Sequence, residues 1–266
     1  MKKKNGFFNM FFTSIYDLSV FSAYVKRGMM KSIIYAVLMI LILGGIQLGI
    51  ESYKMDNLIT NMISELKSDE YDLKIEKNTL KINKPFTAFN EGGRLIYFDP
   101  NLQIEDSEGI RKVTVHEDWY VLLLKNGVVF NELDNNHIIE YNLLLNDRVV
   151  TYNDLDNIKV IIISIFFICK LISIMFNFFI NCLIVAMISS IITLFMKMLV
   201  KSKALYSLTI YASTLPFIMQ TIFNIIRPDI DFDLVFMIGT LIYMSFILRY
   251  IKSDIIERLK HNKSKI

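Results

Sequence analysis

The sequence is poor in the residues that usually build metal sites, disulfide frameworks and cofactor sites. It has two cysteines, three histidines and one tryptophan. Cys169 and Cys182 both lie in one apolar stretch, and neither belongs to a Cys-x-x-Cys pair or a Cys/His cluster. Structural zinc sites and disulfide frameworks need such spacings, so we expect no metal and no cofactor. We interpret both cysteines as small buried apolar residues.

The sequence also lacks the short motifs of the common enzyme classes. It contains no Gly-x-Ser-x-Gly, His-Glu-x-x-His, Gly-x-Gly-x-x-Gly or phosphate-binding loop pattern. The acids Asp99, Glu117 and Asp118 fall in predicted turns, where acids are ordinary. Trp119 offers a surface on which a ligand could stack, but a core aromatic of a sheet is the more usual role. We predict a non-enzymatic protein without catalytic residues.

What the sequence has instead is long apolar runs. Hydrophobic residues make up 53% of the chain, and the mean hydropathy is +0.42. Residues 51–156 carry twenty acidic and eleven basic residues, a net charge of −9, and the total of +3 leaves +12 for the rest. This asymmetry is expected when basic residues stay on the cytoplasmic side of a membrane. The pattern predicts an α-helical, multi-pass membrane protein.

We predict four transmembrane helices with both termini inside. Basic residues precede the first span, and a basic tail at residues 252–266 follows the last. Residues 51–157 would then be extracytoplasmic, and the acidic turn at residues 227–233 would be external. The predicted spans cover residues 32–50, 174–196, 205–226 and 234–251.

The second apolar block, residues 158–196, allows two interpretations. As one helix it would measure about 58 Å, which exceeds a single crossing of about 30 Å. In the first interpretation, residues 174–196 span the membrane and residues 158–173 form a helical extension. In the second, two short spans turn near Asn177–Asn181. We favour one span, because the hairpin would place the lysines after residue 196 outside.

The N-terminal segment is predicted to be an amphipathic helix. Residues 6–25 carry apolar side chains at helical spacing, with basic residues on both sides. Residues 1–31 would therefore form a cytoplasmic or interfacial element. Two placements remain open: the helix lies on the inner leaflet, or it packs on the cytoplasmic end of the bundle.

The extracytoplasmic segment is predicted to be a small α+β domain with an antiparallel sheet. Residues 55–66 have one apolar helical face, after which the apolar period changes to two. Lys125-Asn126-Gly127 is a typical hairpin turn between two strongly apolar strands. The predicted strands cover residues 71–76, 79–82, 94–98, 112–115, 119–124, 127–130 and 137–145.

Polar residues in the apolar segments are the candidate functional groups. In the second block they are spaced three, four and four apart, so they share one helical stripe. Packing against neighbouring helices is the simpler role for them. In the third span a proline predicts a kink beside a polar face. The stripe comprises Lys170, Ser173, Asn177 and Asn181, and the kink and polar face comprise Ser213, Thr214, Pro216 and Gln220.

The acidic stretch RPDIDFD, residues 227–233, raises the question of a metal site. Asp229, Asp231 and Asp233 alternate like the start of a calcium loop. The glycine and glutamate that complete such a loop are missing. We therefore interpret the stretch as a solvated turn between two spans.

The order of the segments resembles a known family. FFNMFFTSIYDLSVFSAYVKRG leads into KSIIYAVLMILIL, an external domain carries IYFDPN, and a later span carries YSLTIYASTLPFIM. This layout resembles the DUF1189 family of Gram-positive bacterial membrane proteins, some of which are described as maltodextrin utilisation proteins. It is more distantly similar to the Yip1-type membrane domain. The resemblance implies a plasma-membrane protein that is accessory to carbohydrate uptake or to envelope processes.

These observations favour a protein that acts through partners. We expect an accessory or scaffold protein in the cell membrane, in contact with the lipid bilayer and with a membrane-protein partner or a second copy of itself, and with no nucleic acid. Two alternatives stay open. The extracytoplasmic domain could bind a small ligand and make the protein a sensor, or the stripe around Lys170 could serve a small solute transporter.

Overall fold

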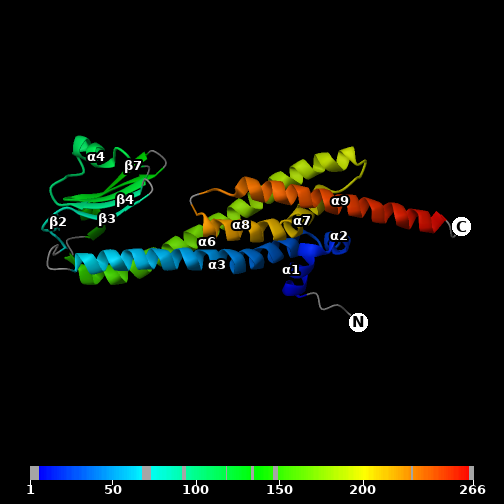
Figure 1. Cartoon of the computed structure of the whole chain (residues 1–266), viewed down its shortest axis with the longest axis horizontal. Coiled ribbons are helices and arrows are strands. Elements are labelled where there is room, and N and C mark those ends of the chain that lie inside the picture. Colours follow the sequence, from blue (N-terminus) through cyan, green and yellow to red (C-terminus); the bar gives the residue numbers. More distant parts are fainter. Residues whose placement is uncertain are drawn as a thin grey trace. The chain divides into compact units, whose positions relative to one another are not determined.

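Figure 1 shows a computed structural model of the chain, which divides into two compact units. The helical unit comprises residues 1–52 and 166–266, and the α+β unit comprises residues 53–165. Two long helices, α3 (Met29–Leu66) and α6 (Tyr152–Phe195), pass from one unit into the other. The structure describes residues 6–67, 73–91, 94–117, 119–132, 135–145, 149–228 and 230–263.

The helical unit is built around one apolar core. Tyr35 and Met39 of α3, Phe178 of α6, and Tyr211 and Phe236 from later helices are all buried in it. The remaining elements of this unit are α1 (Phe7–Tyr16), the 3-10 turn η1 (Leu18–Val20), α2 (Phe21–Val25), α7 (Ser202–Ala212), α8 (Thr214–Ile226) and α9 (Asp233–Lys263).

Several helices are long and apolar enough to cross a membrane. Among the described residues, α3, α6 from Lys159 and α9 meet this criterion singly. The pair α7 and α8 meets it jointly, with a bend of 46° between them. The chain is therefore mostly helical, with three such helices, or four if the bent pair counts as one span. These helices are compatible with a membrane protein.

Helix α6 decides between the two interpretations of residues 158–196. It is one unbroken helix of 44 residues, and it shows no turn at residues 177–181. The hairpin of two short spans is therefore not formed. A helix of this length measures about 66 Å, so it is far longer than one membrane crossing.

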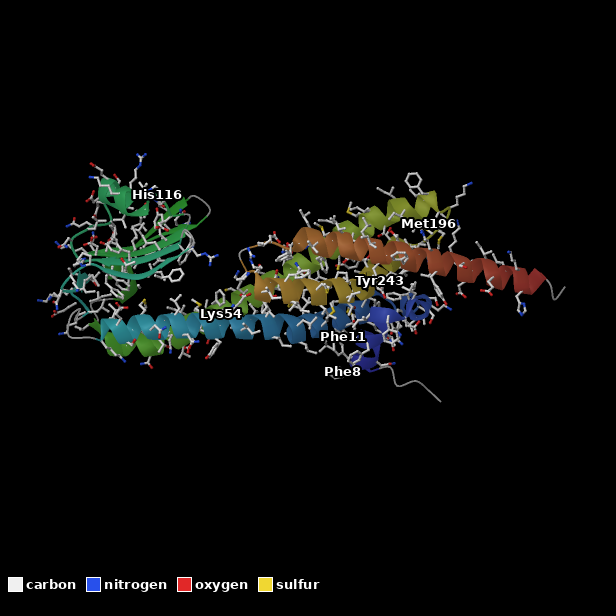
Figure 2. All side chains as sticks on the ribbon, in the orientation of Figure 1. Phe8, Phe11, Lys54, His116, Met196 and Tyr243 are labelled. Carbon is white, nitrogen blue, oxygen red and sulfur yellow. The ribbon has the colours of Figure 1, made fainter. Side chains whose placement is uncertain are left out.

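The N-terminal segment is not the single helix that its apolar spacing predicts. It breaks at Asp17, whose Oδ1 accepts a hydrogen bond from the backbone N–H of Ser19 at 2.9 Å and so caps the turn η1. Helix α1 packs against α7 and α8. Phe7 and Phe11 of α1 face the core, whereas Phe8 is 67% exposed (Figure 2). The contact of this exposed face with lipid stays a prediction.

The α+β unit contains two small sheets. The larger has the strand order β3-β4-β5-β6-β7, in which β4 and β5 are parallel and the other neighbours antiparallel. The smaller has the order β2-β1-β8. The strands are β1 (Lys74–Glu76), β2 (Thr79–Lys81), β3 (Phe86–Glu91), β4 (Arg94–Asp99), β5 (Trp119–Leu124), β6 (Gly127–Glu132), β7 (Asn135–Glu140) and β8 (Val150–Thr151).

Alternating side chains of β5 explain how the larger sheet is covered. Tyr120, Leu122 and Leu124 are buried on the side of α4 (Ser107–Thr114), where they share a core with Ile110. This is the period-two pattern of a strand, and on its other face Leu123 is partly buried against a second core. The β5–β6 turn is the expected Lys125-Asn126 hairpin. It needs Gly127, because a Cβ there would lie 2.6 Å from the carbonyl oxygen of Ile139.

One predicted strand is wrong and another is predicted too long. Residues 112–115 fall mainly in α4, which connects β4 to its parallel neighbour β5, and a parallel pair needs such a crossover. Asp106 caps this helix by accepting from the N–H of Gly109 at 2.9 Å. The predicted strand 137–145 ends at Glu140, and helix α5 (Tyr141–Leu145) follows it. Strands β3 and β8 were not predicted, and residues 71 and 72 lie outside the described residues.

Replacing Leu122 with alanine should destabilise the α+β unit. Leu122 is fully buried at the centre of the core under α4, so truncation removes apolar contacts and leaves a cavity. We expect a loss of about 2–5 kcal/mol. Hydrogen exchange on the full chain in lipid nanodiscs should show faster exchange of the β5 and β6 amides. Leu143→Ala is the matched control, because Leu143 is 78% exposed; equal effects of the two variants would contradict this packing.

Candidate functional sites in the two units

Asp233 joins three helices of the helical unit. It is the first residue of α9, and its two carboxylate oxygens accept hydrogen bonds from the side-chain amides of Asn177 on α6 and Gln220 on α8, both at 2.6 Å. Asp231 Oδ1 accepts from the backbone N–H of Asp233 at 2.8 Å. A carboxylate at a helix N-terminus is also favoured by the helix dipole. We call Asp233, Asn177 and Gln220 the Asp233 cluster.

The Asp233 cluster changes the interpretation of the acidic stretch. Asp233 is half-buried and holds helices together, so the stretch is more than a solvated turn. Asp229 lies outside the described residues. Within the described part of the chain, no three His, Cys, Asp or Glu side chains come close enough to hold a metal ion. Sequence reasoning missed the cluster because its members are 13 and 56 residues apart.

The predicted stripe on α6 does not have one common environment. Lys170 and Ser173 are exposed, and the ammonium of Lys170 lies 5.9 Å from the ring centroid of Phe166. Asn177 belongs to the Asp233 cluster, and Asn181 is buried in the helical unit with 6% exposure. The structure therefore gives these four residues three different surroundings and does not bring them together in one site.

The break between α7 and α8 carries the other predicted residues. Ser213 lies at the break, three residues before Pro216, and a proline in a helix removes the hydrogen bond to the carbonyl four residues earlier, here that of Ala212. The Ser213 hydroxyl donates to the carbonyl of Ile210 at 2.9 Å. Thr214 donates to the carbonyl of Tyr211 at 2.7 Å. Both hydroxyls are fully buried, so the bend lies inside the packed unit.

Three tyrosines surround this break. The ring of Tyr211 lies 4.7 Å from that of Tyr24 and 4.9 Å from that of Tyr35, centroid to centroid. The Tyr35 hydroxyl hydrogen-bonds to Thr214 Oγ1 at 2.8 Å. The guanidinium of Arg27 lies 4.8 Å from the Tyr24 centroid, within the range of a cation–π contact. Sequence reasoning missed this cluster, because its rings come from three separate segments and none of them stands out in an apolar run.

The N-terminal helix α1 also makes specific contacts with neighbouring helices of the helical unit. The hydroxyl of Tyr243 on α9 donates to the backbone carbonyls of Ser14 at 3.1 Å and Ile15 at 2.9 Å (Figure 2). These carbonyls belong to the last turn of α1, where helix carbonyls lack intrahelical partners. The ring of Phe7 lies 5.5 Å from that of Tyr35. A polar contact thus holds α1 against α9, and an aromatic contact holds it against α3.

The α+β unit carries a groove of about 330 Å³ beside α4. Its apolar lining comes from Ile104, Ile110, Val129 and Ile138. Its polar lining includes Arg111 of α4, Tyr120 of β5 and Asn136 of β7, and the Tyr120 hydroxyl donates to Asn136 Oδ1 at 2.6 Å. We call this site the α4 groove. An apolar pocket with a few convergent polar groups is the usual form of a small-ligand site.

Other polar groups of the α+β unit have structural roles. Asp99, in the IYFDPN stretch, is 8% exposed and accepts from the backbone N–H of Asn101 at 2.8 Å, which stabilises the turn after β4. The Tyr97 hydroxyl donates to Asp99 at 3.2 Å. Burial, and then the Asp99 carboxylate, raise the pKa of Tyr97 above its usual value. Trp119 is 40% exposed, so it is not the core aromatic that we expected.

Removing the Asp233 carboxylate should loosen the helical unit. In Asp233→Ala the amides of Asn177 and Gln220 lose their acceptor. We expect a loss of about 1–3 kcal/mol, because the carboxylate is partly exposed. Thermal unfolding of the chain in nanodiscs measures it. Asp233→Asn keeps one acceptor oxygen and should be intermediate, while Glu257→Ala, an exposed acid on the same helix, should have no effect. Equal midpoints for all variants would show that the cluster contributes nothing.

Comparison with known proteins gives one match. A family model described as "Protein of unknown function (DUF1189)" matches residues 8–248. No curated protein and no solved structure matches. The matched range includes nearly all of α1, the bend between α7 and α8, the α+β unit and the first half of α9, so it covers both candidate sites. The chain therefore belongs to the DUF1189 family.

Proposed function

We propose that the chain is a non-enzymatic accessory or scaffold protein of the cell membrane, which acts by binding another membrane component. In this proposal α3, α6, the bent pair α7–α8 and α9 are the four spans. Both termini lie in the cytoplasm, because the basic residues flank the spans on that side, and the acidic α+β unit lies outside.

The observation that carries the proposal is the uncovered apolar surface of α6. Between residues 160 and 172 this helix exposes a series of large aliphatic side chains, although residues 174–196 alone suffice to cross the membrane. Apolar patches that lie outside a bilayer mark contacts with other proteins. The exposed side chains are Val160, Ile161, Ile162, Ile165, Ile168 and Ile172, with exposures of 44–62%.

The continuity of α3 and α6 supports the same proposal. Each helix runs without a break from the helical unit into the α+β unit. Within the α+β unit, Lys159 of α6 pairs with Asp56 of α3 at 2.9 Å and donates to Thr60 at 3.1 Å. The two units are therefore joined by helices and not by an irregular linker. Binding outside would thus be connected to the spans.

The hydrogen bonds of the polar residues in the spans argue against the transporter alternative. Asn177 and Gln220 are bonded to Asp233, and Thr214 is bonded to Tyr35. These groups therefore join helices rather than line a path for a solute. Lys170 is exposed beside Phe166, on the outside of the helical unit.

Site-specific photocrosslinking in native membranes tests the accessory role. A photoreactive phenylalanine analogue at Ile165 or Ile168 should capture one recurrent membrane protein. Met187 and Leu194 are matched controls, because they lie on the same helix and are 65% and 68% exposed, against 57% and 56% at the test positions. In the proposed topology the control positions face lipid and should give no discrete protein adduct.

The outcomes separate the possible partners. A carbohydrate permease is the first candidate to examine, because of the resemblance to maltodextrin utilisation proteins. Adducts only to a second copy of the chain would make the surface a self-association interface. If the test and control positions both give no protein adduct, the accessory role is refuted.

A sensor is the second candidate function, and the α4 groove favours it. The groove lies in the unit that is proposed to be external, and that unit is joined to the spans by α3 and α6. Ligand binding in the groove could therefore act on the spans through these helices.

A further inference from the structure

We propose that the α4 groove binds a small amphipathic anion, with an apolar body in the groove and a carboxylate at Arg111. The inference deepens the sensor candidate and does not depend on the accessory role. It rests on the shape of the groove, on its charge and on the free hydrogen-bond donors in its wall.

The groove has room for a small apolar group. Its volume of about 330 Å³ lies in the range of small-ligand sites. Ile104 and Ile110 line one side, and Val129 and Ile138 line the sheet side. Ile138 is 54% exposed on the edge strand β7, so apolar surface remains open to a ligand. Covering such surface favours binding.

The positive charge of Arg111 in the groove favours an anionic ligand. Arg111 is the one charged residue among the nine that line it, although the segment 51–156 carries a net charge of −9. Within the described part of the chain, Arg111 makes no hydrogen bond or ion pair. A guanidinium presents several donors in a fixed plane and binds a carboxylate through two parallel hydrogen bonds.

The acids nearest in sequence are engaged elsewhere. Asp106 caps α4 at Gly109, and Glu108 pairs with Lys112 at 2.8 Å. Glu105 accepts from the side-chain amide of Asn126 at 3.0 and 3.1 Å. These contacts leave Arg111 as the charge that a ligand in the groove would meet.

Asn136 supplies a second donor. Its Oδ1 accepts the hydrogen bond from Tyr120, which orients the amide and leaves the Nδ2 group to donate. Asn136 is on β7 and Arg111 is on α4, so the two donors come from different elements that line the groove. The Asp106 cap fixes the start of α4, and Ile110 packs the middle of this helix into the core. The backbone that carries Arg111 is therefore in place before a ligand binds, which lowers the entropic cost of binding.

Cysteine protection on the full chain in nanodiscs tests the proposal. Ser107 lines the groove, so Ser107→Cys places a thiol there, in a background with Cys169→Ser and Cys182→Ser. The alkylation rate by a hydrophilic maleimide is measured with phenylbutyrate or with phenylbutanol, its neutral analogue. We expect the carboxylate to slow alkylation and the alcohol to have a much smaller effect. A thiol at Lys112→Cys, one residue from Arg111 and outside the groove lining, should not be protected.

Arg111→Gln and Lys125→Gln are the paired variants for charge, because Lys125 is an exposed cation outside the groove lining. Arg111→Gln should raise the phenylbutyrate concentration for half-protection about tenfold, because it removes a charge-assisted pair. Lys125→Gln should leave this concentration unchanged. Both residues are exposed, so both variants should fold.

Three results would overturn the proposal: no protection by either compound, equal protection by both, or equal effects of the two variants. The test uses the chain without any partner. A failure of the groove is therefore separate from a failure of the accessory role.

Discussion

The continuity of α3 and α6 is the constraint on which the rest of the structure depends. A helix in an apolar environment satisfies its backbone hydrogen bonds internally, and interrupting it there is costly. Neither helix contains a proline, and the glycines of α3 at 44, 45 and 49 leave it unbroken. The chain therefore passes from apolar to amphipathic sequence without a turn. In the sequence, all described strands of the α+β unit lie between these two helices.

The α+β unit contains two small apolar cores. One lies under α4, and the other includes Leu66 of α3 together with the small sheet. The second core uses a residue of a long helix, so this helix is part of the unit and not merely a tether. Small sheets gain stability when they pack against a helix. The same arrangement leaves α4 beside the edge strand β7, which creates the groove.

The sequence predicted the elements whose pattern is local. The apolar runs, the helical start of the α+β unit and the Lys125-Asn126 hairpin follow from periodicity and turn chemistry. Residues 112–115 alternate like a strand, but the crossover between parallel β4 and β5 makes them helical. The Asp233 cluster and the α4 groove could not be predicted in the same way. Each joins side chains from separate elements, and its geometry depends on tertiary packing.

Helix α6 makes a polar contact in each of the two units. Lys159 contacts α3 inside the α+β unit, and Asn177, eighteen residues later on the same helix, binds Asp233 of α9. Both contacts are made by one continuous helix. Within the helical unit, Asp233 connects Asn177 of α6 to Gln220 of α8. Helix α8 follows the bend at which the tyrosine rings and α1 are packed. The hydrogen bonds of Asp233 thus join α6 and α9 to the helix that follows the bend, so three helices of this unit depend on one half-buried carboxylate whose partners lie far apart in the sequence.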